Sequence, residues 1–470
     1  STATIKVKGG ARYGTMLKNY ETNKTYRITA KLSVDTHMAT FFIDGKKVCT
    51  RMFDTPVEAI TRVMFRTGDL FQYPNIETPA DQWVDMPRAD EQDKLASYMI
   101  ANVKSQSLDN DSGASVLKYE NFSHYAEKFN NMEDENIVTD IPNSQSSEWM
   151  SKNIPLFECP QENFEEMFYY RWWTLRKHIK RTPVGYGMTE FLVQRSYSDR
   201  YNLIACAIGH HVMESRWLRD TTYLHQILKT WYRGNDGKPM AKMTKFSSWN
   251  PAAIFEAYKV HGDKTFILDM TPDMEAEFDY WKTTHRLPSG LYWQEDVKDG
   301  MEESISGGRR KQYARPTINS YMYGNANALA EINEMAGNKE KAESYKQEAE
   351  SIKTLIKNNL WNKDRLFFET MKGDTLAKAR EAIGYIPWYF NMPDARAYDA
   401  AWKQITDENG FSAPYGLTTA ERRHPEFRSH GVGTCEWDGA IWPFASSQTL
   451  TAMANYINNY PSPIMTDSIF

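Results

Sequence analysis

Two kinds of hydrophobic spacing divide the chain. Near the start, residues 25–32 alternate polar and apolar side chains, a period of two that predicts a half-buried β-strand. Phe41–Ile43 and Lys46–Val48 flank Asp44-Gly45, a dipeptide that favours a two-residue type I′ hairpin. With a further predicted strand at Val63–Arg66, this pattern indicates an antiparallel β domain at the N-terminus.

From about Gln161 the spacing becomes helical. Apolar residues recur three or four positions apart at Phe164, Phe168, Trp172 and Leu175. The same spacing predicts a helix over 318–336 and a second after it, and Gly337-Asn338 between them predicts an antiparallel hairpin. Further helices are predicted at 201–214, 221–232, 251–261, 273–284, 396–406 and 441–459. Paired helices with long aromatic-rich loops indicate a mainly α domain, a toroid of helical hairpins whose loops carry the chemistry.

The region between these two patterns is rich in turn residues, including Pro74, Pro79, Pro87 and the run Asp109–Gly113. We therefore predict three parts. The first is a partial β-sandwich over residues 1–72, the second an irregular connector over 73–160, and the third a helical domain over 161–470.

Composition excludes several classes of function. Of the 470 residues, 56 are Lys or Arg and 61 are Asp or Glu, so the net charge is −5 with neutral histidines, and no long basic run indicates nucleic acid. No uncharged apolar stretch of about 18 residues predicts a membrane span. Four scattered cysteines without a CxxC pair predict no metal site. Aromatic residues make up 13% of the chain and often stand beside carboxylates, Asn and Arg, as in sugar-binding clefts.

The most informative segment is an acidic, glycine-containing loop. It holds Glu295, Asp296, Asp299, Glu302 and Glu303 just before the helix predicted at 318–336. A solvated acidic loop is one interpretation. The other is a loop at the mouth of a helical barrel, where partial desolvation raises the pKa of a carboxyl, as a general acid for a glycosidic oxygen requires.

Two further segments alternate chemistry-bearing residues. In the first, Glu436 and Asp438 alternate with Trp437 and Trp442 before a helix with Pro443 in its first turn. This pattern fits either aromatic packing or a sugar-binding wall. The second segment contains His210 and His211. Side chains at adjacent positions of a helix point in different directions, so we expect no metal to bind this pair. Arg216 and Trp217, which follow, fit a sugar subsite or a structural ion pair equally well.

Four segments of the sequence resemble those of a known family. The segments DGMEES at 299–304, RPTINSYMYGNANALAEI at 315–332, LWNKDRLFFE at 360–369 and WDGAIWPFASSQTLTAMANYI at 437–457 resemble the (α/α)6-barrel six-hairpin glycosidases. Among these the nearest type is the mannosylglycerate-hydrolase-like catalytic domain related to glycoside hydrolase family 63. The N-terminal FFIDGKKV hairpin resembles part of a concanavalin-like, laminin-G-type domain.

The resemblance implies roles for particular residues. The loop acid of the relatives corresponds to Glu302, although Glu stands where they mostly have Asp, so Glu303 and Asp299 stay open as alternatives. The Trp-Arg-Gly-Pro-(Ile/Val)-Trp segment of the relatives corresponds to Trp437–Trp442, whose rings line the sugar subsite. Asp438 stands where the relatives have Arg, which inverts the preference of this subsite for the charge of a substrate. Other expected substrate contacts are Trp293, Arg216, Trp217, Tyr323 and Asn327.

We therefore expect an inverting glycoside hydrolase with Glu302 as general acid, no metal or organic cofactor, and an oligo- or polysaccharide substrate. The relatives carry their general base in a Glu-x-Tyr segment after the Trp-Gly-Trp motif. No such segment precedes Phe470, so we expect the base on a part of the polypeptide beyond residue 470, or else at Glu436 or Asp438.

Alternatives from other classes are a non-catalytic glycan-binding protein and a polysaccharide lyase that uses Tyr321, His424 and Arg422-Arg423. The sugar stays open among arabinofuranosidase, rhamnosidase, glucosidase and mannosidase actions. The resemblance implies a periplasmic or extracellular location.

Overall fold

The computed structural model of the protein separates into two compact units, Ser1–Asn121 and Phe122–Phe470, and each is described by itself. It describes residues 4–9, 12–18, 21, 24–33, 38–52, 117–431, 433, 435–461, 463–466 and 469–470. The strand predicted at Val63–Arg66 and the first part of the predicted connector lie outside these residues.

The first unit consists of antiparallel strands. Strands β1 (Thr4–Gly9) and β2 (Arg12–Lys18) pair with each other, and β3 (Ile28–Ser33), β4 (Met38–Ile43) and β5 (Lys46–Met52) form a three-stranded sheet in that order. Asp44 and Gly45 both have positive φ, 49° and 79°, as a type I′ turn requires, so the predicted hairpin is confirmed. The Asp44 side chain also accepts the Arg27 backbone N–H at 2.8 Å.

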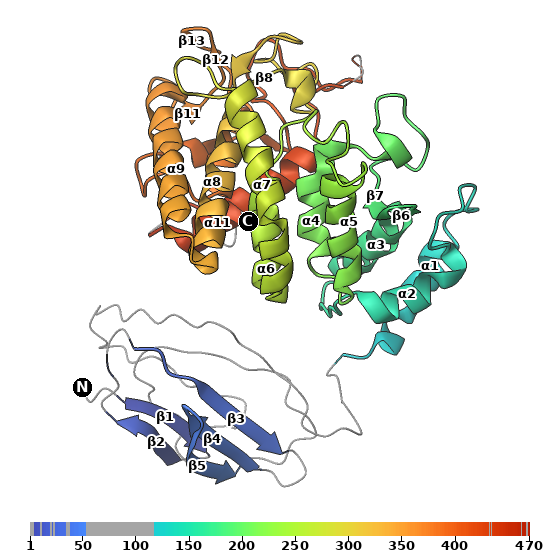
Figure 1. Ribbon diagram of the computed structural model, residues 1–470, viewed down its shortest axis with the longest axis vertical. Coiled ribbons are helices and arrows are strands. Elements are labelled where there is room, and N and C mark those ends of the chain that lie inside the picture. Colours follow the sequence, from blue (N-terminus) through green and yellow to red (C-terminus); the bar gives the residue numbers. More distant parts are fainter. Residues whose placement is uncertain are drawn as a thin grey trace. The chain divides into compact units, whose positions relative to one another are not determined.

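The second unit is mainly helical (Figure 1). Its helices are α1 (Ser123–Asn130), α2 (Ser146–Asn153), α3 (Glu162–His178), α4 (Ile208–Ser215), α5 (Thr221–Arg233), α6 (Asn250–His261), α7 (Lys264–Thr284), α8 (Pro316–Ala336), α9 (Lys339–Asn359), α10 (Ile386–Tyr389) and α11 (Pro443–Asn459). The predicted fold class, a mainly helical domain after a small antiparallel sheet, is confirmed.

The hairpin of α8 and α9 is the best example of the predicted pattern. The two helices lie side by side (Figure 1), and Gly337 ends α8 with a φ of +83°. Helix α8 also contacts α6, α7 and α10, which explains why nearly its whole circumference is buried. It is the central support for the loop that precedes it.

Three helix boundaries differ from the predictions. Residues Tyr201 and Asn202 both have a φ of 63°, so the helix predicted at 201–214 begins only at Ile208. Helix α7 begins at Lys264 rather than 273, because Asp263 caps it by accepting the Phe266 backbone N–H at 2.9 Å. The helix predicted at 396–406 is a short 3-10 helix, Asp399–Gln404.

Short strands hold the loops of the helical unit. Strands β8 (Trp293–Gln294) and β9 (Tyr313–Ala314) pair antiparallel and belong to a four-stranded sheet with β12 (Met371–Lys372) and β13 (Thr375–Leu376). The remaining strand pairs are β6 (Ile179–Thr182) with β7 (Gly185–Met188), β10 (Trp361–Asn362) with β11 (Phe367–Phe368), and β14 (Ser412–Ala413) with β15 (Gly416–Leu417). The acidic loop thus leaves and re-enters one sheet, which closes it at its base.

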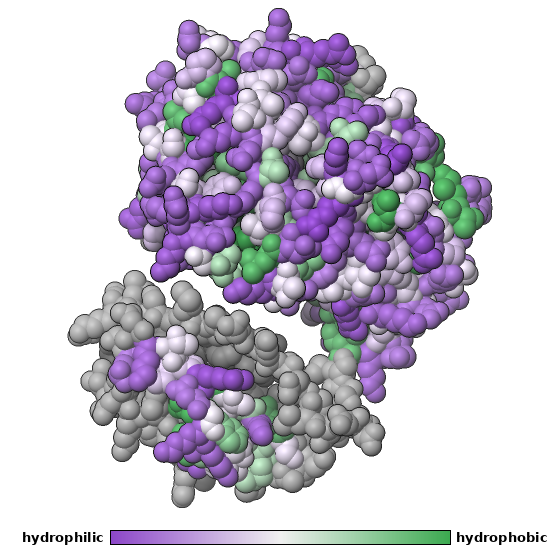
Figure 2. All heavy atoms as spheres, in the orientation of Figure 1, coloured by the Kyte–Doolittle hydropathy of each residue, from purple (hydrophilic) through white to green (hydrophobic). Residues whose placement is uncertain are grey.

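The surface of the helical unit is largely hydrophilic on the face that Figure 2 shows, with apolar side chains in separate small patches. Among the residues that the structure describes, none of the helices is both long and apolar enough to cross a membrane.

Candidate active site

The acidic loop packs against the start of α4. An added Cβ at Gly300 would lie 2.4 Å from the Cys206 Sγ, so the loop backbone touches the turn that leads into this helix. On the other side, the Lys298 carbonyl accepts the Ser247 backbone N–H at 3.0 Å. These contacts hold the loop in place through its backbone, independently of its carboxylates.

Asp299 anchors the loop from below. Its carboxylate accepts hydrogen bonds from the hydroxyls of Ser247 and Thr317 and pairs with the Arg315 Nε at 2.5 Å. The side chains of Asp299 and Arg315 are both 0% exposed. A carboxylate so fully enclosed and paired holds structure and has no access to a substrate.

Asp296 closes the loop on itself. This residue is buried, and its two carboxylate oxygens accept the backbone N–H groups of Val297 at 2.7 Å and Arg309 at 3.1 Å. Its contacts are therefore all within the loop.

Glu302 is the exception among these acids. It is half-buried, and no hydrogen bond or ion pair joins its carboxylate to another side chain among the residues that the structure describes. Desolvation raises the pKa of this carboxyl above its ordinary value, and the charges of Asp296 and Glu303 raise it further. A hydrogen bond from its own backbone N–H and the charge of Arg309 oppose this shift. A carboxyl in these surroundings stays protonated to a higher pH, as a general acid must.

Glu303 is held by arginines. Its Oε2 accepts the Arg428 Nη2 at 3.0 Å, and its Oε1 lies 3.9 Å from the Arg309 Nη1. Its backbone φ is +64°, a left-handed conformation that is uncommon for a residue with a side chain.

A second accessible carboxylate, Glu190, belongs to the segment after β7. Its side chain is exposed, yet desolvation by the surrounding protein raises its pKa, and the charge of Glu302 raises it further. The Thr189 hydroxyl donates to the Asn202 carbonyl at 2.7 Å, which ties this segment to the chain that leads to Cys206.

The two tryptophans of the second acidic segment form one stacked pair. The ring centroids of Trp437 and Trp442 are 5.0 Å apart with an interplanar angle of 7°. Trp437 is buried, whereas Trp442 is half-buried and donates its Nε1–H to the Glu436 carbonyl at 3.1 Å. Only Trp442 can therefore offer much ring surface to a ligand.

The carboxylates beside this pair have structural partners. Glu436 accepts the backbone N–H groups of Gly431 at 3.0 Å and Gly433 at 2.8 Å. Asp438 accepts the Arg428 Nε at 2.6 Å. The structure thus brings Glu302, Glu303, Asp299, Glu436, Asp438, Trp437 and Trp442 into two adjoining loops that Arg428 connects.

Other predicted site residues have partners elsewhere. Trp293 stacks on His285, with ring centroids 4.3 Å apart, at the end of α7. Arg216 lies 4.9 Å from the Trp217 ring at the end of α4, whereas Cys206 and the acidic loop lie at the start of this helix. Tyr323 is buried in α8, where Asn327 hydrogen-bonds it and Lys353 and Glu350 are its charged neighbours.

The histidine pair and the residues considered for a lyase have structural surroundings of their own. His210 and His211 are buried, and desolvation lowers their pKa values to about 4 and about 3, so both are neutral. Tyr321 accepts a hydrogen bond from the Gln448 side chain at 2.8 Å, whereas Arg422 and Arg423 donate to backbone carbonyls of Glu408, Asn409 and Ser412.

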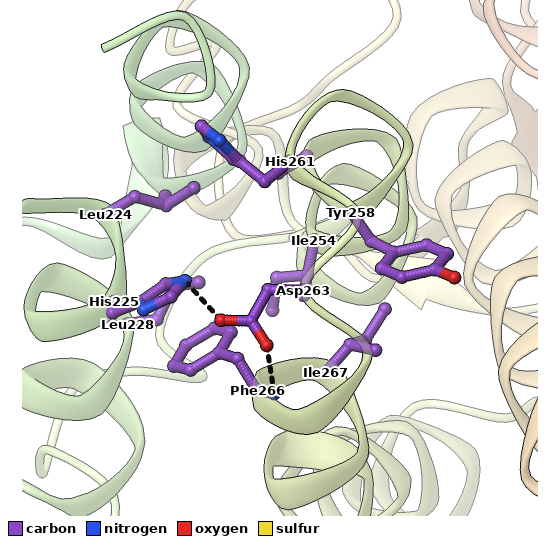
Figure 3. A pocket seen from close by; sticks show the side chains of 10 residues that line it. Leu224, His225, Leu228, Ile254, Tyr258, His261, Asp263, Phe266 and Ile267 are labelled. Carbon is purple, nitrogen blue, oxygen red and sulfur yellow. Dashed lines mark hydrogen bonds and ion pairs between the residues drawn. The ribbon is translucent and has the colours of Figure 1, made fainter. Parts of the chain in front are cut away.

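Two small hollows lie among the described residues of the helical unit. The first, about 20 Å³, lies between α5, α6 and α7 (Figure 3), where His225 stacks on Phe266 at 3.7 Å and lies 3.9 Å from the Asp263 Oδ2. The second, about 10 Å³, lies behind the acidic loop, between Met301, Arg315, Glu381 and Trp437. Within the described part of the chain, no group of three His, Cys, Asp or Glu residues is arranged to hold a metal ion.

Sequence reasoning missed Glu190, Arg315 and Arg428. Arg315 begins one of the quoted segments, but its pairing with Asp299 is seen only in the structure. The ion pairs of Arg428 with Glu303 and Asp438 are likewise seen only in the structure.

Comparison with known proteins places this site in a family. The family described as "Mannosylglycerate hydrolase MGH1-like glycoside hydrolase domain" matches residues 200–463, and the one described as "Sialidase-like, CBM domain" matches residues 1–82. A solved structure named "Sialidase" is 63% identical, with a TM-score of 0.75, over 99% of this chain and 43% of that chain.

Two other similar proteins are more distant. The family 63 mannosylglycerate hydrolase of Thermus thermophilus is 12% identical, with a TM-score of 0.46, over 55% of this chain and 81% of that one. An uncharacterized protein of Borreliella burgdorferi is 20% identical over 182 residues, 38% of each chain. This chain thus spans less than half the length of either the sialidase or the Borreliella protein.

The family match covers more than half of the 470 residues and includes both loops of the site, which confirms the predicted family. The chain therefore belongs to the mannosylglycerate hydrolase MGH1-like glycoside hydrolases and carries an N-terminal sialidase-like CBM domain.

Proposed function

We propose that this chain cleaves a glycosidic bond in an oligo- or polysaccharide, with Glu302 as the general acid that protonates the leaving oxygen. One observation carries the proposal. Of the four acids from Asp296 to Glu303, only Glu302 is partly accessible and has no hydrogen-bonded partner side chain in the described part of the chain. Its surroundings raise its pKa, which suits proton donation.

The proposed mechanism is inverting. In such enzymes a second carboxylate activates a water on the opposite face of the sugar, at a separation of roughly 6.5–9.5 Å from the acid. Glu436 and Asp438 are engaged with loop amides and with Arg428, so we do not assign them this role. Among the described residues, Glu190 is the carboxylate that we propose for this second role.

The sugar is proposed to stack on the Trp437–Trp442 pair, chiefly on Trp442. Trp293, Arg216, Trp217, Tyr323 and Asn327 have partners elsewhere, so any contact they make belongs to more distant parts of an extended substrate. The name of the 63% identical protein makes a sialoside one substrate to test. We further propose that the chain acts in the periplasm or outside the cell, where polysaccharides are met.

The test uses a panel of aryl glycosides, including an aryl sialoside, and three proteins: wild type, Glu302→Gln and Glu295→Gln. Glu295 lies on the same loop and serves as the matched control. We expect Glu302→Gln to lose about 10²- to 10⁴-fold in kcat/KM. The loss should be smaller for a 2,4-dinitrophenyl glycoside than for a phenyl glycoside, because a good leaving group needs less protonation. Glu295→Gln should keep wild-type activity.

Three results would refute parts of this proposal. Equal activity of Glu302→Gln and wild type would remove the acid assignment. Retention of the anomeric configuration, read by proton NMR of the first-formed product, would remove the inverting mechanism. An unsaturated product that absorbs in the ultraviolet would indicate a lyase, and binding without any product would indicate a glycan-binding protein.

A further inference from the structure

Arg428 makes an ion pair on each side of its guanidinium. Its Nε donates to the Asp438 Oδ2 at 2.6 Å, and its Nη2 donates to the Glu303 Oε2 at 3.0 Å. The Arg428 backbone N–H also donates to the Asp438 carbonyl at 3.1 Å. Asp438 follows Trp437, and Glu303 follows Glu302, so one side chain joins the aromatic pair to the acidic loop.

The burial of the Asp438 and Glu303 carboxylates requires a positive charge beside them. The exposed fraction is 9% for the Asp438 side chain, 18% for that of Glu303 and 39% for that of Arg428. The Asp438 Oδ1 is buried without a hydrogen-bond partner among the described residues. Arg428 therefore provides the opposite charge that this withdrawn carboxylate needs.

The backbone next to Glu302 depends on the same contact. Glu303 has a φ of +64°, a conformation that the surrounding structure must hold in place for a residue with a side chain. Its carboxylate also fills the space beside Gly433, where an added Cβ would lie 2.2 Å from the Glu303 Oε2. The Glu303 side chain is thus held between the two loops.

We propose that Arg428 is a positioning residue: by holding Glu303 and Asp438 together, it fixes the Glu302 carboxyl relative to the Trp437–Trp442 pair. This inference rests on the proposed function of Glu302. Glu303 and Asp438 are then the structural partners of Arg428 and donate no proton to the substrate. The negative charge of Asp438 is compensated by the arginine ten positions before it.

The network also predicts opposite electrostatic effects. The charge of Glu303 raises the pKa of Glu302, and Arg428 offsets that charge. Loss of Arg428 should therefore raise the pKa of Glu302 further, whereas loss of the Glu303 charge should lower it. A purely structural role would not produce these opposite shifts.

The experiment compares wild type with Arg428→Gln, Arg428→Lys, Glu303→Gln and Arg233→Gln. Arg233 is the matched control, since its guanidinium also bridges two carboxylates, Asp269 at 3.0 Å and Asp273 at 2.6 Å, with 31% of the side chain exposed, but between α5 and α7. Thermal unfolding of each variant first establishes that it is folded.

We expect Arg428→Gln to lower kcat on the order of 100-fold, with a smaller change in KM, because a misplaced acid acts on the transition state. The basic limb of its kcat/KM profile should move to higher pH, and that of Glu303→Gln to lower pH. Arg428→Lys should recover part of the loss, and Arg233→Gln should match wild type. The proposal is wrong if folded Arg428→Gln keeps the wild-type kcat and the wild-type basic limb of the kcat/KM profile. It is also wrong if Arg233→Gln changes kcat and the basic limb as much as Arg428→Gln does.

Amide hydrogen exchange separates this proposal from the proposed function. In Arg428→Gln, but not in Arg233→Gln, the amides of residues 300–305 and 436–440 should exchange faster. If they do while wild-type protein cleaves no glycoside, the hydrolysis proposal fails and the loop-joining role of Arg428 stands. If their exchange is unchanged, the loop-joining role fails whatever the activity.

Discussion

At the scale of single residues, the site is defined by which carboxylates lack partners. Asp296, Asp299 and Glu303 are neutralised or hydrogen-bonded by the protein, whereas Glu302 and Glu190 are accessible, and the charge of Glu302 disfavours ionisation of Glu190. Two carboxyls that disfavour each other's charge are a common basis for separate acid and base roles.

This pair gives a pH prediction. A general acid must be protonated, so the activity falls as pH rises through the pKa of Glu302, which is raised above its ordinary value. The charge of Glu302 raises the pKa of Glu190, and repulsion between two like charges is mutual. The substitution Glu190→Gln should therefore lower the pKa of Glu302 and move the basic limb of the kcat/KM profile to lower pH. Desolvation, the largest cause, remains, so the limb should stay above the pKa of a free glutamate.

The same variant decides the role of Glu190. Disappearance of the acidic limb with a loss of about 100-fold or more would identify Glu190 as the general base. A shifted basic limb with retained activity would place the base elsewhere. A profile identical to that of Glu295→Gln would contradict any contribution of Glu190.

At the scale of elements, caps and short strands determine where the helices lie. The hydrophobic spacing predicted α3, α5, α6, α8, α9 and α11 to within a few residues. It missed the first nine residues of α7, a stretch that follows the Asp263 cap and contains Pro272. Loop paths such as that of Tyr201 and Asn202 were not predictable, since their positive φ values depend on tertiary contacts.

Asp263 supports a stability prediction for α7. Its carboxylate caps the helix and lies 3.9 Å from His225 (Figure 3). We expect Asp263→Ala to reduce the free energy of unfolding by about 1 kcal/mol, measured by urea denaturation. Asp263→Asn should lose less, because asparagine is also a good cap. Equal losses in both variants would contradict the capping role and indicate the ion pair instead.

At the scale of the whole molecule, the helical unit begins before the residue that periodicity alone suggests. The domain predicted at 161–470 lies within a unit that starts at Phe122. Helices α1 and α2 cover α3: the Trp173 Nε1 donates to the Asn130 side chain at 2.8 Å, and the buried Arg176 donates to Ile141 and Asn143. The polar composition of this segment concealed its supporting role.

Two fragments test this organisation. We expect 122–470 to unfold cooperatively and to keep wild-type activity on a small aryl glycoside. Fragment 161–470 should be destabilised by several kcal/mol, because it exposes the aromatic face of α3 and leaves Arg176 unpaired. Loss of residues 1–121, which include the sialidase-like CBM domain, should weaken binding to a polymeric substrate only. Equal thermal stability of the two fragments would contradict this division.

The site itself was partly predictable from the sequence. Glu302, Trp437 and Trp442 stand in compact motifs, so local reading found them, although their catalytic and binding roles stay predictions. Glu190 and Arg428 act across loops from distant parts of the chain, and local patterns carry no information about such contacts without an alignment or a structure.

The enclosed pair of Asp299 and Arg315 restricts how this loop can vary. A change at either position alone strands a charge in the interior, at a cost of about 3–5 kcal/mol, comparable with much of a domain's net stability. A change at Glu302, three residues further along the loop, leaves no buried charge without its partner. A change of side chain at Glu302 therefore costs little folding stability, whatever it does to activity, whereas Asp299 and Arg315 can change only together. The loop can thus alter the length of its acid without being refolded.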